Sequence, residues 1–60
     1  MNINKLFSKL SPSQAANVQN VNGHLVFDNG AKIYQALVSE DGELVPLDIA
    51  TRDMLKQLDT

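Results

Sequence analysis

The chain of 60 residues contains no cysteine and no tryptophan, and it has a single histidine. The absence of cysteine excludes disulfide bonds and thiolate zinc sites. One histidine and scattered carboxylates do not form a metal-binding pattern, so we expect no metal and no cofactor. A chain this short buries a modest fraction of its surface, and small domains usually need an additional source of stability. Oligomerisation or docking on a larger protein is therefore expected.

Long apolar runs and dense basic patches are absent as well. No apolar run approaches the about 18 residues of a membrane span, and polar residues interrupt the first ten positions, unlike a signal peptide. Residues 1–39 carry three lysines and one aspartate, whereas residues 40–60 carry two cations and six carboxylates. Duplex-binding proteins concentrate positive charge against phosphates. We predict a soluble, intracellular protein, cytoplasmic or within a virus particle, and neither nucleic acid nor membrane is its favoured partner.

Patterns typical of catalysis are missing too. The three glycines are isolated, so no phosphate-cradling loop is present. The acidic turn at residues 40–43 lacks the alternating oxygen ligands of a calcium loop. His24 has no nucleophile or carboxylate as a predicted neighbour, and the hydroxyl residues, Thr51 among them, fall in cap, turn or polar-face positions. We therefore predict a protein that is not an enzyme and has no small-molecule substrate.

The sequence does contain a strand, turn, strand, turn, strand pattern in residues 23–47. Apolar-rich runs at His24–Asp28, Ala31–Val38 and Glu43–Leu47 are separated by turn residues. Asn29-Gly30 between two such runs indicates a two-residue type I′ turn with positive φ at both positions. We predict a three-stranded antiparallel meander over residues 23–47.

The predicted turns set the register of this meander. A two-residue Asn29-Gly30 loop pairs Phe27 with Lys32, and a two-residue Asp41-Gly42 loop pairs Val38 with Val45. The predicted core face then holds Leu25, Phe27, Tyr34, Ala36, Val38, Val45 and Leu47. The opposite face holds His24, Val26, Ile33, Gln35, Leu37, Ser39, Leu44 and Pro46. A three-residue loop over 40–42 would turn the third strand over and exchange one apolar set for another. Pro46 cannot donate to a ladder, which places this strand at a sheet edge.

The N-terminal segment, residues 1–22, is predicted to be helical. Ser11-Pro12-Ser13-Gln14 is a helix start with a capping box and proline in the first turn. Residues 18–21 either belong to the helical segment, in which a helix of about two turns starts at Pro12, the preferred interpretation, or form a fourth strand that pairs with His24–Phe27 through an Asn22-Gly23 turn. An apolar stripe marks one side of the first ten residues: Ile3, Leu6, Phe7 and Leu10. This stripe packs on the sheet, docks on another protein or lies at a membrane interface.

The last segment, residues 48–59, is predicted to be an amphipathic helix with Asp48 as its N-cap. Its apolar side, which we assign to the core, consists of Leu47, Ala50, Met54, Leu55 and Leu58. The sequence therefore predicts an α+β fold in one small domain, residues 1–60. In it, a three-stranded or four-stranded antiparallel meander packs against N-terminal and C-terminal helices.

The sheet face opposite the core is the strongest candidate for a functional surface. A solvated face is normally polar, yet Val26, Ile33 and Leu37 gather there. We predict that these residues, with His24 and Gln35, bind a partner, and that the N-terminal stripe is a secondary contact.

The expected function is that of a non-enzymatic protein-interaction module. It would act as a subunit of a homo- or hetero-oligomeric assembly, for example an accessory or structural component of a virus particle. One alternative is an inhibitor or adaptor of a larger cellular enzyme. A second is a weak nucleic-acid or membrane-surface binder that uses Lys5 and Lys9.

Overall fold

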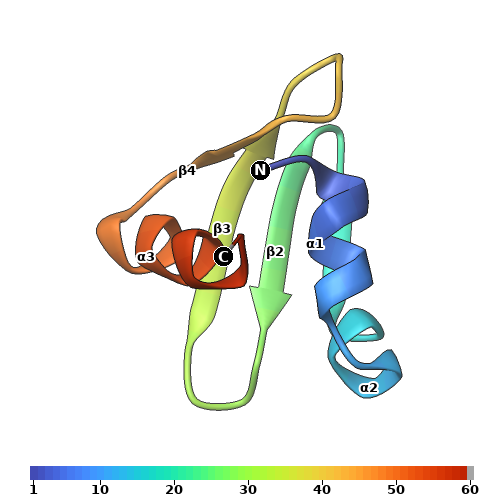
Figure 1. Cartoon of the computed structure of the whole chain (residues 1–60), viewed down its shortest axis with the longest axis vertical. Coiled ribbons are helices and arrows are strands. Elements are labelled where there is room, and N and C mark those ends of the chain that lie inside the picture. The colour runs from blue at the N-terminus through green and yellow to red at the C-terminus, as the bar shows by residue number, and fades with distance from the viewer. Residues whose placement is uncertain (60) are drawn as a thin grey trace.

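A computed structural model describes residues 1–59, which form a four-stranded antiparallel sheet and three helices (Figure 1). Along the chain the elements are α1 (Ile3–Lys9), α2 (Pro12–Ala15), β1 (Val18–Val21), β2 (His24–Asp28), β3 (Ile33–Val38), β4 (Leu44–Pro46) and α3 (Ile49–Leu58). The strand order is β1-β2-β3-β4, so each strand pairs with its neighbour in sequence. The predicted α+β fold is confirmed, in its four-stranded form.

Helix α1 packs on the sheet through its apolar stripe. Asn2 caps the helix, since its side chain accepts a hydrogen bond from the Asn4 N–H at 2.8 Å. Leu6 is 0% exposed and joins the core, and Ile3 and Leu10 pack against that core. Of the predicted stripe, Phe7 is the member that stays 40% exposed. Most of this stripe therefore contacts the core that the sheet forms with α3.

Helix α2 is shorter than predicted and leads into a strand. Its capping box is present, because the Gln14 N–H donates to Ser11 Oγ and the Ser11 N–H donates to Gln14 Oε1. The helix ends at Ala15, and the preferred interpretation of a helical segment through residue 22 is wrong. Asn22 and Gly23 both have positive φ, 53° and 81°, as a type I′ turn requires. β-branched valines and asparagines are weak helix formers, so this turn decides the local structure in favour of β1.

The hairpin of β2 and β3 is shifted by two residues from the predicted register. Phe27 pairs with Tyr34 instead of Lys32, and His24 pairs with Leu37 instead of Gln35. A two-residue shift leaves every side chain on its predicted face, because side chains alternate with a period of two. The faces predicted for β2 and β3 are therefore correct although the partners are not.

The cause of the shift is a wider loop, residues 29–32. Gly30 has φ 94°, but Asn29 does not have positive φ, so the predicted type I′ turn is wrong. Instead the Asp28 carboxylate accepts from the Gly30 N–H at 2.9 Å, and the Asn29 side chain accepts from the Lys32 N–H at 3.1 Å. Such side-chain hydrogen bonds stabilise a longer turn.

Strand β4 is turned over relative to the favoured register. Val38 pairs with Leu44 instead of Val45, because the loop has three residues, with the Ser39 N–H donating to Glu43 O at 2.9 Å. Leu44 is buried, whereas Val45 and Leu47 are about half exposed. The predicted core positions of Val45 and Leu47 are therefore wrong, and Leu44 and Pro46 lie on the core side instead.

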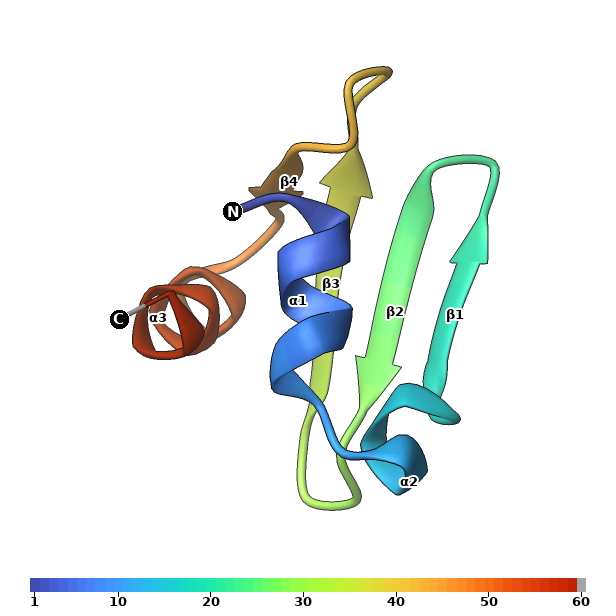
Figure 2. The same ribbon diagram turned by 45° about the vertical axis from the view of Figure 1, so that its right-hand side comes forward.

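The core lies between the sheet and helices α1 and α3 (Figure 2). Its buried apolar members are Leu6, Leu25, Phe27, Ala36, Leu44 and Leu55. The Phe27 and Tyr34 rings stack with centroids 5.9 Å apart. Asp48 caps α3 as predicted, accepting from the Thr51 N–H at 2.6 Å. Thr51 itself is 1% exposed, so its predicted cap, turn or polar-face position is wrong.

Replacing Gly30 by valine is expected to lower the free energy of unfolding by about 1–2 kcal/mol. A Cβ at Gly30 would meet no atom within 4 Å, so the loss comes from forcing a β-branched residue to φ 94°. Urea unfolding followed by circular dichroism measures it. Gly30→Asn is the control, since asparagine tolerates positive φ, and equal midpoints for the valine variant and the parent would contradict this loop geometry.

Candidate functional site

The candidate site is the sheet face that points away from α1 and α3, which we call the open face. Residues on it alternate with the core residues of each strand, and both helices lie on the core side (Figure 2). Its apolar members are Val21, Val26, Ile33, Leu37 and Val45, and its polar members are Gln19, His24, Asp28 and Gln35. Four of the apolar side chains are 47–62% exposed, and Val26 is half-buried.

The register aligns these residues into rows across the strands. One row crosses all four strands, because Val21 pairs with His24, His24 with Leu37, and Leu37 with Val45. Strands lie about 4.8 Å apart, so this row is about 15 Å long. Val26 belongs to the next row. The open face is therefore a continuous surface on which five apolar side chains alternate with polar ones, with His24 inside the long row and Asp28 opposite Ile33.

On the open face the side chains of His24 and Gln35 form a hydrogen bond with each other. His24 Nε2 and Gln35 Oε1 lie 2.9 Å apart, although the two residues are diagonal rather than direct neighbours in the ladder. This hydrogen bond joins β2 to β3 on the face. Within residues 1–59 the imidazole contacts an amide rather than a nucleophile or carboxylate, so the geometry offers a hydrogen-bonding group rather than an acid–base pair.

The structure brings all five predicted partner-binding residues to one face: His24, Val26, Ile33, Gln35 and Leu37. Sequence reasoning missed Val21 because residues 18–21 were assigned to the helical segment, and it missed Val45 because of the one-residue register difference. The Asn22-Gly23 pair was the signal that could have found Val21. The open face is therefore wider than predicted and extends over both outer strands.

The secondary set on α1 is placed differently. Leu6 is fully buried and Ile3 and Leu10 are partly buried, so most of this stripe is engaged within the fold. Lys5 forms an ion pair with Asp59, and this contact holds the pKa of the Asp59 carboxyl below its usual range. One of the two lysines of the basic alternative is therefore already matched by a carboxylate.

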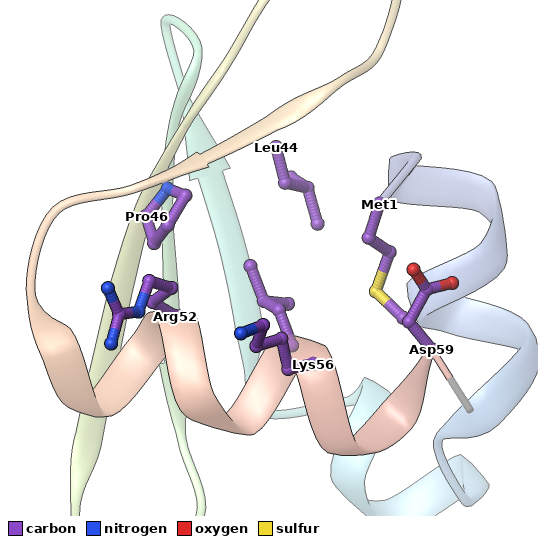
Figure 3. A pocket seen from close by; sticks show the side chains of 7 residues that line it. Met1, Leu44, Pro46, Arg52, Lys56 and Asp59 are labelled. Carbon is purple, nitrogen blue, oxygen red and sulfur yellow. The ribbon is translucent and has the colours of Figure 1, made fainter.

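A small cavity of about 150 Å³ lies between β4, α3 and the N-terminal residue (Figure 3). Its lining residues are Met1, Leu44, Pro46, Arg52, Leu55, Lys56 and Asp59. Pockets that hold drug-sized molecules usually measure about 300–1,000 Å³. This cavity is therefore too small for such a ligand.

Residues 1–59 contain neither a metal-binding cluster nor a membrane-spanning helix. Within residues 1–59, no three histidine, aspartate or glutamate side chains converge so that they could hold a metal ion. The helices in this described part of the chain are also too short or too polar to cross a membrane. The acidic residues near the turns serve local structure, since a hydrogen bond from Ser39 lowers the pKa of Asp41 and one from the Thr51 backbone lowers the pKa of Asp48.

Comparison with family models, curated proteins and solved structures gives no significant match to this chain.

Proposed function

We propose that this protein is a non-enzymatic interaction module that works as a subunit of an oligomeric assembly and contacts its partner through the open face. The supporting observation is the row in which Val21, Leu37 and Val45 are about half exposed, on a sheet face that no helix within residues 1–59 covers. The solvated face of an antiparallel sheet is normally polar. A contiguous apolar patch on a small protein is typical of an interaction surface.

The chemistry of the open face favours a flat protein partner. Burying the exposed halves of Val21, Ile33, Leu37 and Val45 would contribute about 1 kcal/mol each in transfer free energy. The costs of association are of similar size or larger, so this face alone supports a weak contact. The His24–Gln35 pair adds a polar point near the centre that orients the partner.

The area of the open face also indicates that this face alone supports only a weak contact. Strand spacing of about 4.8 Å and a rise of about 3.3 Å per residue give the open face about 300 Å² in projection. Each partner of a standard stable interface contributes about 800 Å². A stable assembly therefore needs additional surface beyond the open face of one copy.

Ile33→Asp tests this proposal. We expect the variant to keep its circular dichroism spectrum, because Ile33 is 53% exposed, and to lose at least tenfold in affinity, because a carboxylate is unfavourable in an apolar contact. Sedimentation velocity measures self-association, and retention of partners from the native lysate measures hetero-association.

Ile49→Asp is the matched control. Ile49 is 70% exposed at the start of α3, outside the sheet, so the same chemical change should leave both associations unaltered. Unchanged binding by Ile33→Asp, or equal losses in the two variants, would contradict the assignment of the open face. Unfolding of Ile33→Asp would place Ile33 in the monomer core.

A further inference from the structure

The edge of the sheet at β1 has free backbone hydrogen-bonding groups. In the β1–β2 ladder, Val21 and His24 flank the two-residue turn, and the Asp28 N–H donates to Asn17 O at 3.3 Å. Antiparallel ladders alternate, so Gln19 and Val21 direct their backbone groups toward β2. Val18 and Asn20 direct theirs away from the sheet. Within residues 1–59 these outward groups have no backbone partner, and we call them the β1 edge.

The β1 edge also lacks the usual protection. Natural edge strands carry lysine, proline or a bulge, or are covered by another element. Val18–Val21 has the sequence Val-Gln-Asn-Val, with no charge and no proline. Figure 2 shows no helix or loop lying alongside β1 on its outer side. This strand is therefore a template for pairing with another strand.

The opposite edge of the same sheet is closed. The Leu44 N–H of β4 donates to Met1 O at 2.8 Å, and the Ile3 N–H donates to Gly42 O at 2.8 Å. Pro46 faces the same outer side and has no N–H to offer. The contrast between the two edges makes β1 the side on which the sheet can grow.

We infer that β1 pairs antiparallel with β1 of a second copy of this chain, giving a continuous eight-stranded sheet. A two-fold axis at Gln19 sets Val18 of each copy opposite Asn20 of the other. In this register both free N–H groups and both free carbonyls of each β1 edge are satisfied by the second copy. The contact is self-complementary, as a two-fold interface requires.

Charge favours a second copy as the occupant, and the pairing also enlarges the open face. Each chain has a net charge of −2, but none of it lies on Val18–Val21, so the two strands meet without like charges. Gln19 lies opposite its own copy, so both open faces fall on the same side of the joined sheet. The apolar face then doubles to about 600 Å² in projection. That is closer to the about 800 Å² that each partner of a stable interface contributes.

This inference extends the proposed function by naming the first partner, and it uses the backbone groups of the β1 edge, with Gln19 as the one open-face side chain that lies at the axis. Gln19→Cys tests it directly, since the chain has no other cysteine. Residues opposite each other in a non-hydrogen-bonded antiparallel pair have Cα atoms about 4.5 Å apart, within the reach of a disulfide. We expect rapid covalent dimerisation under mild oxidation, seen on non-reducing gels. Gln57→Cys on α3 is the control and should cross-link at least tenfold more slowly.

Gln19→Lys provides the second measurement. Two ammonium groups would meet at the axis, so the dimer dissociation constant from sedimentation equilibrium should rise at least tenfold, while Gln57→Lys should leave it unchanged. Any of three results would overturn the inference. They are equal cross-linking rates at positions 19 and 57, a parent protein that is monomeric at millimolar concentration, and an unaltered dimer dissociation constant for Gln19→Lys. Ile33→Asp should keep the cross-link at position 19, which separates failure of the open face from failure of the β1 edge.

Discussion

Replacing Leu6 by alanine is expected to lower the free energy of unfolding by about 2–5 kcal/mol. Leu6 is 0% exposed and is the residue of α1 that enters the core beside Leu25, Phe27 and Leu55. A chain of 60 residues has a total stability of about 3–9 kcal/mol at the usual value per residue. The variant should therefore be partly unfolded at 25 °C, as measured by urea titration with circular dichroism.

Phe7→Ala is the matched control on the same helix. Phe7 is 40% exposed, so truncating it should cost less than half as much as truncating Leu6. Equal losses for the two variants would contradict the orientation of α1 on the sheet. A parent-like unfolding midpoint for Leu6→Ala would show that α1 does not contribute to the core.

The sequence was sufficient where structure depends on neighbouring residues. The Ser11–Gln14 capping box and the Asp48 cap were predicted because each is made by residues three positions apart. The helical assignment of residues 18–21 was wrong because two local signals conflict there. Asparagine and valine follow a strong helix start, and the Asn22-Gly23 turn decides the outcome only when β2 is available for pairing.

The part of the open face on β2 and β3 was predicted correctly, and the part on β4 was not, because the two hairpins differ in how far the predicted register was shifted. The β2–β3 shift of two residues preserved the face of Ile33 and Leu37, so the centre of the open face was found. The β3–β4 shift of one residue exchanged Val45 for Leu44, so one margin of the face was misplaced. Loop length decides between these cases, and Asx hydrogen bonds such as that of Asp28 set the loop length in ways that residue types alone do not reveal.

Thr51 illustrates what the sequence does not show. A threonine on a helix is normally assigned to a polar side, yet Thr51 is 1% exposed. Its Oγ1 accepts from the backbone N–H of Gln35 at 3.0 Å, while the Gln35 carbonyl accepts from the Leu47 N–H at 3.0 Å. The hydroxyl thus takes the place of a strand partner where β4 ends. Only the long-range packing of α3 against β3 creates this requirement.

Thr51→Val should lower the free energy of unfolding by about 1–3 kcal/mol, because the nearly isosteric side chain leaves the part-buried Gln35 N–H without its acceptor. The hydrogen-exchange rate of the Gln35 amide should rise at least tenfold more than the rates of amides that exchange only through global unfolding. Thr51→Ser keeps the hydroxyl and should keep the amide protected, even if the lost methyl group lowers stability. Unchanged Gln35 protection in Thr51→Val would contradict this bond. Because the Gln35 side chain bonds to His24 on the open face, α3 fixes the backbone of an open-face residue from the core side of the sheet.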